Sequence, residues 1–234
     1  MSVLPRIVIG TNNWHDKTDR EDILGFCQCN GMDTIEILPN SNYLKQVNSY
    51  FNVIAEIEDD ELDESRTYYA ILCGAKSLGD AMIDKLTMYK RRGICEKTGL
   101  SLYLTQDVEK SYNFDIVQIP YSVFDRRFEK YFPIWKEKGI EIHTRSVFLQ
   151  GVAFEPEKLF AVMSDKLIPK INTIKNLGNL PFLLLTYALL NTNIDKVVMG
   201  IDSLDMLKKN LSIFQTLDSL EIKDEHILLP YNWS

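Results

Sequence analysis

The chain alternates short apolar runs with stretches of helical periodicity, separated by brief polar breaks. Several of the apolar runs are continuous, as expected for strands that are buried on both faces of a sheet. Alternating strands and helices with short loops are typical of parallel β-α-β units, and therefore predict an α/β fold. The predicted strands are Arg6–Gly10, Asp33–Ile37, Tyr68–Leu72, Ser101–Leu104, Asp115–Ile119, Glu141–Arg145 and Lys196–Met199. The predicted helices are Arg20–Cys29, Asn42–Ile57, Gly79–Arg91, Asp125–Lys138, Leu167–Leu177, Pro181–Asn191 and Ser203–Leu217.

Length and composition indicate one domain that spans residues 1–234. A chain of 234 residues, 45% hydrophobic and 25% charged, can bury a full core without splitting into two domains. No apolar run approaches the roughly 20 residues that span a bilayer. The N-terminus lacks the pattern of a secretory signal. We therefore expect a soluble cytoplasmic protein with no membrane segment.

Charge and residue spacing argue against two further classes of function. The net charge of −7 disfavours nucleic-acid binding, because affinity for the phosphate backbone is built from many Lys and Arg contacts. The four cysteines and three histidines lack the spacing of metal sites. We expect neither a nucleic-acid partner nor a bound metal.

Motifs along nearly the whole chain resemble those of the aldo/keto reductases. Gly139–Gly151, with its E-I-H-x-R-S-x-F-L-Q-G pattern, resembles the seventh strand and cofactor-side loop of one branch of that family. The other matching segments are Ile7–Trp14 for the first strand, Gly31–Thr34 for the second, Ala70–Lys76 for the third, Arg92–Tyr103 for the fifth, Phe114–Phe128 for the sixth and Asp195–Leu211 for the eighth. The resemblance implies a (β/α) barrel of the TIM type.

The predicted strands number seven, whereas such a barrel normally has eight. Between Lys76 and Gly99 there is room for one helix, where the family has two helices with a strand between them. We therefore expect an incomplete barrel of seven parallel strands, with the fourth βα unit missing. A gap in the barrel would expose strand edges, which invite pairing, so a homodimer is expected.

The resemblance also implies a catalytic site without its proton donor. Members of the family move hydride from a nicotinamide to a carbonyl carbon while a tyrosine protonates the oxygen, assisted by a lysine, an aspartate and a histidine. Asp33 and Lys76 stand at the aspartate and lysine positions, although a leftover structural ion pair is the alternative interpretation of these two. Leu38 stands at the tyrosine position, and the segment that would carry the histidine is missing. Tyr43 is a less favoured substitute donor.

Cofactor positions implied by the resemblance lie mainly in the second half. Ser101 and Gln118 stand where the family holds the nicotinamide carboxamide, and Arg145 where many members stack an aromatic ring. The other implied contacts are Thr11, Trp14, Ser146, Gly151, Gly200 and Asn210. Turn geometry explains Gly151 and Gly200 equally well. NADPH and NADH are the candidate cofactors, but Asp202, Asp205 and Met206 disfavour a 2′-phosphate.

Three functions fit these observations. The first is a degenerate aldo/keto reductase-like pseudoenzyme that binds a small molecule or a partner. The second is an enzyme of surface carbohydrate biosynthesis, NAD(P)-linked or cofactor-free, that acts on a sugar or nucleotide sugar through Asp33, Lys76 and Arg145. The third is an active aldo/keto reductase with a rearranged site.

Overall fold

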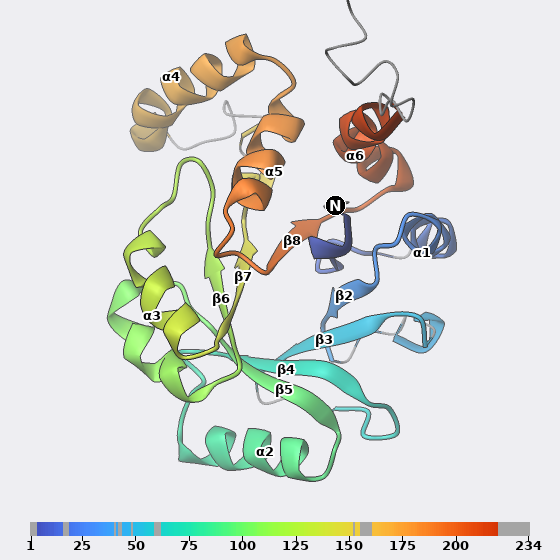
Figure 1. Ribbon diagram of the computed structural model, residues 1–234, viewed down its shortest axis with the longest axis vertical. Coiled ribbons are helices and arrows are strands. Elements are labelled where there is room, and N and C mark those ends of the chain that lie inside the picture. The colour runs from blue at the N-terminus through green and yellow to red at the C-terminus, as the bar shows by residue number, and fades with distance from the viewer. Residues whose placement is uncertain are drawn as a thin grey trace, which may run out of the picture.

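In the computed structural model the strands close into one barrel (Figure 1). The structure describes residues 4–15, 19–39, 41, 44–47, 49–58, 62–151, 153–154 and 161–219. Within these residues eight strands pair in sequence order, each parallel to the next, and β8 closes against β1. The strands are β1 (Ile7–Gly10), β2 (Thr34–Ile37), β3 (Asn52–Ile57), β4 (Tyr68–Gly74), β5 (Cys95–Ser101), β6 (Ile116–Pro120), β7 (Glu141–Arg145) and β8 (Lys196–Gly200).

The helical layer around the barrel is uneven. The α-helices are α1 (Arg20–Cys29), α2 (Asp80–Arg91), α3 (Phe132–Glu137), α4 (Ala161–Leu177), α5 (Leu180–Leu190) and α6 (Leu204–Ser219). Short 3-10 helices are η1 (Leu4–Arg6), η2 (Leu44–Gln46), η3 (Thr105–Asn113), η4 (Glu129–Tyr131) and η5 (Leu149–Gly151). Among the described residues no α-helix lies between β2 and β4. Buried side chains of the connecting segments, including Leu44, Phe51 and Leu62, belong to the core on this side instead.

The expectation of seven strands with a missing fourth unit is wrong. The overlooked strand is β3, which lies within the predicted helix Asn42–Ile57. Val47, Phe51 and Ile54 recur at helical spacing, but the run Asn52–Ile57 is rich in β-branched residues and mostly buried, which favours a strand. Tyr68–Gly74 is therefore the fourth strand, so Lys76 follows the fourth strand and not the third.

The fifth strand begins earlier than predicted. The sequence pattern placed it at Ser101–Leu104, whereas β5 ends at Ser101. Its first residues are polar, which hides the strand from a search for apolar runs. Gly99 lies in β5 beside Leu72 and Ile116, whose side chains fill the centre of the barrel. A Cβ atom there would stand 2.9 Å from Cγ of Leu72 and 3.0 Å from Cβ of Ile116, so this position requires glycine.

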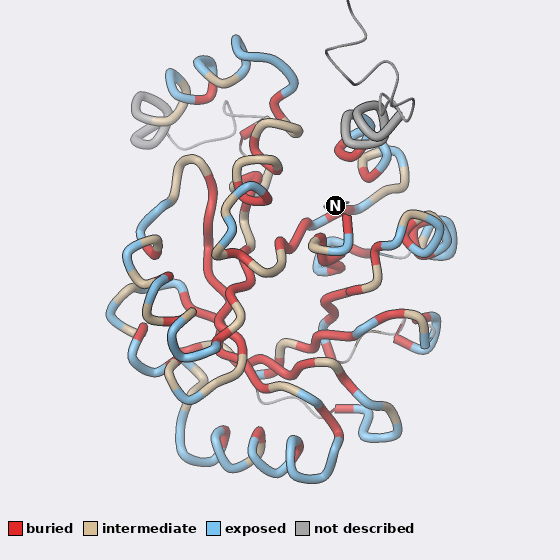
Figure 2. The backbone as a smooth tube through the Cα atoms, in the orientation of Figure 1, coloured by how far each residue is buried: buried red, intermediate tan, exposed pale blue. Residues whose placement is uncertain are grey.

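The barrel interior is packed in layers. A small apolar cluster, separate from the larger core between strands and helices, fills its middle with Val8, Ile54, Ala70, Leu72, Ile116 and Val198. Figure 2 shows the strands as the buried centre of the molecule, with most exposed positions on helices and loops. A filled centre is typical of eight-stranded parallel barrels, in which the interior is a core and not a pore.

A polar network closes the N-terminal end of the barrel, which we call the barrel floor. The Lys97 ammonium forms an ion pair with the Glu141 carboxylate and donates a hydrogen bond to the Tyr69 hydroxyl, 2.9 Å away. Tyr69 donates in turn to Glu141 Oε2 at 3.0 Å. Nε2 of the fully buried His143 lies 3.2 Å from the same oxygen. His143 is thus a buried member of the hydrogen-bonded network at the barrel floor.

Closure of the strand ladder also removes the argument for a dimer through exposed strand edges. Each described strand pairs on both sides, because β8 bonds to β1 through Ile7–Gly10 and Val197–Gly200. Arg6, just before β1, strengthens this seam by donating to the carbonyl oxygens of Leu189 at 2.6 Å and Asn191 at 3.2 Å. None of the described helices is long and apolar enough to cross a membrane.

Candidate functional site at the barrel mouth

The barrel mouth is the end at which the C-termini of the strands meet, and loops at this end carry the sites of most eight-stranded barrels. Four polar side chains lie there on neighbouring or facing strands, above the apolar cluster. They form what we call the mouth cluster: Glu36 of β2, Ser101 of β5, Gln118 of β6 and Arg145 of β7. Glu36, Ser101 and Gln118 are buried, and Arg145 is half-buried.

Hydrogen bonds connect the mouth cluster into one chain across the barrel. The Gln118 amide Nε2 donates to Glu36 Oε2. The Ser101 hydroxyl lies 3.5 Å from Gln118 Oε1, at the limit of a hydrogen bond. Arg145 Nη2 donates to Ser101 Oγ at 3.0 Å and to the Leu102 carbonyl at 3.3 Å. Glu36 is therefore coupled to Arg145 through two neutral side chains rather than by a direct ion pair.

Burial makes the Glu36 carboxyl a weaker acid than an ordinary glutamate. It raises the pKa of this carboxyl from 4.5 to about 7, assisted by the nearby negative charge of Glu56 on β3. The hydrogen bond from Gln118 and the positive charge of Arg145 oppose this increase. A carboxyl group with a pKa near 7 can both accept and release a proton at neutral pH, as general acid–base chemistry requires.

The guanidinium of Arg145 contacts the aromatic ring of Tyr103. Its guanidinium carbon lies 3.7 Å from the ring centroid of Tyr103, which follows β5 and is 54% exposed. This stacked contact covers one face of the guanidinium. The Arg145 Nε atom is buried and has no hydrogen-bond partner among the described residues. The Nε–H is thus a donor that no described residue uses.

The two residues predicted to be catalytic do not form one site. Asp33 immediately precedes β2, at the barrel floor, where its carboxylate lies 3.8 Å from the Lys196 ammonium. Lys196 also donates to Thr34 Oγ1 at 2.9 Å. Lys76 lies beyond the opposite end of β4 and is exposed. An Asp33–Lys76 ion pair, the alternative interpretation, is therefore not formed.

Leu38, at the predicted position of the proton-donating tyrosine, lies near the mouth and is 46% exposed. Tyr43, the less favoured substitute donor, lies outside the described residues.

Thr11 and Trp14 follow β1 at the mouth. The Thr11 hydroxyl donates to the backbone carbonyl of Glu36 at 2.8 Å, and its N–H donates to the same oxygen at 3.1 Å. Trp14 is mostly buried, and its backbone N–H donates to the Thr11 backbone carbonyl at 2.9 Å. Thr11 thus helps to fix the strand segment that carries Glu36.

The remaining predicted cofactor residues are more dispersed. Ser146 follows Arg145 with a φ of 61°, and Gly151 ends η5 with a φ of 85°, so turn geometry alone accounts for glycine at 151. Gly200 ends β8 and is exposed. Asn210 is buried in α6, and its amide lies 3.8 Å from the Met199 sulfur. Asn210 therefore faces the core and not the mouth.

The N-terminus of α6 is partly satisfied by the chain itself. The Met206 N–H donates to Ser203 Oγ at 3.3 Å, and the Ser203 hydroxyl donates to the Asp202 carboxylate at 3.0 Å. A negative charge at this position opposes binding of a second anion. The weak binding of a 2′-phosphate at this position stays a prediction.

Sequence reasoning missed Glu36, Glu56 and Tyr103. The D-T motif points to Asp33, three residues earlier, as the carboxylate of the site, and away from Glu36. A signal was present, because Glu36 stands between Ile35 and Ile37 in a strand buried on both faces, where an acidic residue has no structural reason to occur. Among the described residues no three His, Cys, Asp or Glu side chains are grouped as a metal site requires.

No protein-family model and no curated protein sequence matches the chain. Solved structures do. The holo form of an aldo-keto reductase from Bacillus halodurans is 15% identical, with a TM-score of 0.71 over 90% of this chain and 86% of that one. Its apo form gives a TM-score of 0.68. An aldo/keto reductase from Klebsiella pneumoniae in complex with NADP and acetate is 10% identical, with a TM-score of 0.63 over 96% and 89% of the two chains.

The chain thus forms a closed parallel barrel of eight strands whose fold is similar to that of solved aldo-keto reductases. At these identities the similarity concerns the fold, and function has to be argued from the site.

Proposed function

We propose that this barrel binds a small polar ligand at its mouth and lacks standard carbonyl reductase activity. The observation that carries the proposal is the placement of Asp33 and Lys76 at opposite ends of the barrel. Carbonyl reduction of the family type needs an aspartate and a lysine beside a proton-donating tyrosine. Because Asp33 pairs with Lys196 at the floor, it is not available to adjust the acidity of a group at the mouth.

The mouth cluster favours a ligand that carries both hydroxyl groups and an anionic group. The planar guanidinium of Arg145 suits a carboxylate or phosphate, and its Nε–H is not used by a described residue. Glu36 and Gln118 supply acceptors and donors for hydroxyl groups beside it. A sugar phosphate, a sugar acid or a nucleotide sugar combines these features.

Calorimetric titration tests the binding half of this proposal. We expect wild-type protein to bind glucose 6-phosphate or UDP-glucose more tightly than NADPH, and Arg145→Ala to weaken that binding about tenfold or more through loss of a charge-assisted contact. Arg126→Ala is the matched control, because Arg126 also lies over a tyrosine ring, that of Tyr187 at 5.0 Å, but is exposed and donates to the Val123 carbonyl rather than to the mouth cluster. Micromolar NADPH binding that survives Arg145→Ala would contradict the proposal.

A separate prediction concerns reductase activity. Wild-type protein should oxidise neither NADPH nor NADH in the presence of 4-nitrobenzaldehyde, because general-acid assistance of about 10²–10⁴-fold is missing. The measurement is loss of nicotinamide absorbance, with Lys76→Met as the matched variant. Wild type and variant should be indistinguishable, and wild-type turnover well above that of Lys76→Met would refute the assignment.

One observation favours a second candidate, an enzyme that moves a proton on a sugar or nucleotide sugar without a nicotinamide. Glu36 has a pKa of about 7 and lies in a water-poor site connected to Arg145. In such a reaction the Glu36 carboxylate would take a proton from the carbon next to a carbonyl, while Arg145 holds the anionic group. Exchange of that carbon-bound hydrogen for solvent deuterium, seen by NMR and lost in Glu36→Gln, would support this function over simple binding.

A further inference from the structure

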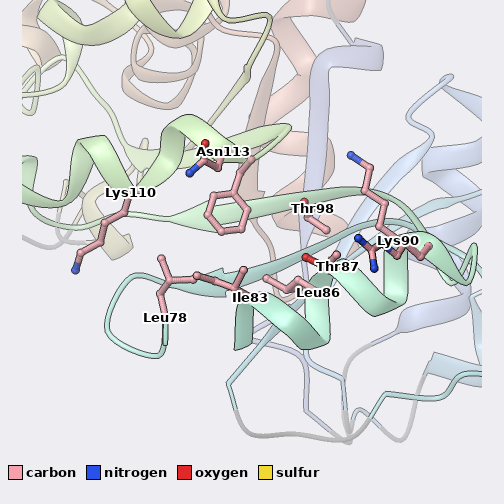
Figure 3. Close-up of a pocket in the computed structure, with 10 residues that line it drawn as sticks. Leu78, Ile83, Leu86, Thr87, Lys90, Thr98, Lys110 and Asn113 are labelled. Carbon is pink, nitrogen blue, oxygen red and sulfur yellow. The ribbon is translucent and has the colours of Figure 1, made fainter. Parts of the chain in front are cut away.

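A cleft of about 610 Å³ lies on the outside of the barrel wall, between α2, β5 and η3 (Figure 3). It contains none of the mouth-cluster residues. One flank is a stripe along α2 formed by Ile83, Leu86, Thr87, Lys90 and Arg91. The opposite side comes from Lys110, Asn113 and Phe114 at the end of η3, with Thr98 of β5 between the two.

The short helix η3 explains why this cleft is open. In a regular barrel of βα units, an α-helix follows each strand and packs beside the next helix. After β5 the described chain forms a 3-10 helix of 9 residues, so α2 has no full-length neighbour on this flank. Ile83 is consequently 44% exposed although it lies on the stripe that also carries the buried Leu86.

The lining combines an apolar floor with positive charge. Its apolar residues are Leu78, Ile83, Leu86 and Phe114, and its charged residues are Lys90, Arg91 and Lys110, with no acidic residue among them. Lys90 and Lys110 have partners outside the lining, Asp115 at 2.6 Å and Asp107 at 2.7 Å. Arg91 forms an ion pair with no carboxylate among the described residues. Arg91 therefore supplies the positive charge of the lining that no described carboxylate offsets.

We propose that this cleft binds a small amphipathic anion, a hydrocarbon chain or ring that bears a carboxylate. The apolar part lies on Ile83, Leu86 and Phe114, and the carboxylate contacts Arg91, whose guanidinium fork matches it. The volume falls within the range of small-molecule pockets, roughly 300–1,000 Å³. A folded protein partner needs an interface of roughly 1,000 Å² with good complementarity, more than this single cleft provides.

Titration of the full-length protein with dodecanoate, below its micellar concentration, tests the proposal. We expect saturable binding with one site, and much weaker binding of dodecyltrimethylammonium, which has the same chain with the opposite charge. Arg91→Ala should weaken dodecanoate binding about fivefold to tenfold. Ile83→Asp should abolish dodecanoate binding, because it places a negative charge among the apolar residues of the cleft. Ile83 is exposed, so the substitution does not disturb the core.

Two controls make the result specific. Arg92→Ala removes the neighbouring charge, whose carboxylate partner Glu64 lies outside the cleft at 2.9 Å, and should leave binding unchanged. Arg145→Ala should also have no effect, which separates this site from the barrel mouth. Thermal unfolding confirms that each variant is folded. Equal affinity for the cationic amphiphile, or dodecanoate binding that survives Ile83→Asp, would overturn the proposal.

Discussion

Replacing Glu141 with alanine should lower the free energy of unfolding by about 2–3 kcal/mol, because the Lys97 ammonium would remain at the barrel floor without its counter-ion. The same substitution removes the acceptor of the Tyr69 hydroxyl and of His143. Glu141 and Lys97 are 28% and 29% exposed, so water recovers part of the cost and the effect falls below that of a fully buried pair. Urea unfolding at neutral pH measures the difference.

The matched control is Glu64→Ala, which breaks the surface ion pair with Arg92. That pair is 2.9 Å long, and its side chains are 40% and 54% exposed. Exposed pairs contribute about 0–1 kcal/mol, so this variant should be nearly neutral. If both variants lose the same small amount of stability, the floor network is not a structural element of the barrel.

The Glu141 contribution should depend on pH. Burial opposes ionisation of this carboxyl, but hydrogen bonds from His143 and Lys97 together with their charges hold its pKa at about 2, below the ordinary 4.5. A carboxyl group whose pKa is lower in the folded state than in the unfolded state stabilises the fold at pH values above the unfolded-state pKa. This stabilisation is lost as the pH falls and the carboxylate of the folded protein becomes protonated. The stability gap between wild type and Glu141→Ala should be constant above about pH 5 and narrow from there towards pH 2.

Replacing Glu36 with glutamine should raise stability at alkaline pH. A pKa displaced from 4.5 to about 7 means that the folded state resists ionisation, and this costs about 3 kcal/mol once the carboxylate is charged above pH 7. Wild-type stability should therefore fall as pH rises from 4.5 to 7. Glutamine keeps an oxygen that can accept from Gln118 and carries no charge, so the variant should lack this slope.

The control for this prediction is Glu96→Gln, the same chemical change at an exposed position of β5. It should alter neither the stability nor its pH dependence. Urea unfolding of wild type and both variants at several pH values between 5 and 8 provides the measurement. A wild-type slope that persists in Glu36→Gln would show that another group titrates in this range.

Most of the barrel could be predicted from sequence because its strands are short apolar runs with helices between them. β1, β2, β4, β6, β7 and β8 lie within one or two residues of the predicted bounds. The errors have physical causes. Val47, Phe51 and Ile54 repeat at helical spacing and concealed β3, and the polar start of β5 concealed its first residues. A local pattern cannot reveal that two distant segments pair as neighbouring strands.

The candidate site was harder to predict because its placement depends on which end of a strand a residue occupies. Asp33 and Glu36 are three residues apart, yet Asp33 lies at the floor and Glu36 reaches the mouth. The family resemblance points to Asp33 through its motif, D-T, and the structure places Asp33 just before β2, at the floor. Gln118, Ser101 and Arg145, which the family resemblance proposes as cofactor contacts, lie within hydrogen-bond distance of one another at the mouth, and their contact with a cofactor stays a prediction.

The wall between β2 and β4 has consequences for how short such a protein can become. Here the crossovers from β2 to β3 and from β3 to β4 include no described α-helix, yet the strand ladder is continuous. A barrel of this kind can therefore lack the α-helix of a crossover connection and still keep every strand. Chain length is therefore a poor guide to strand number, and a designer of compact enzymes could shorten these two connections first.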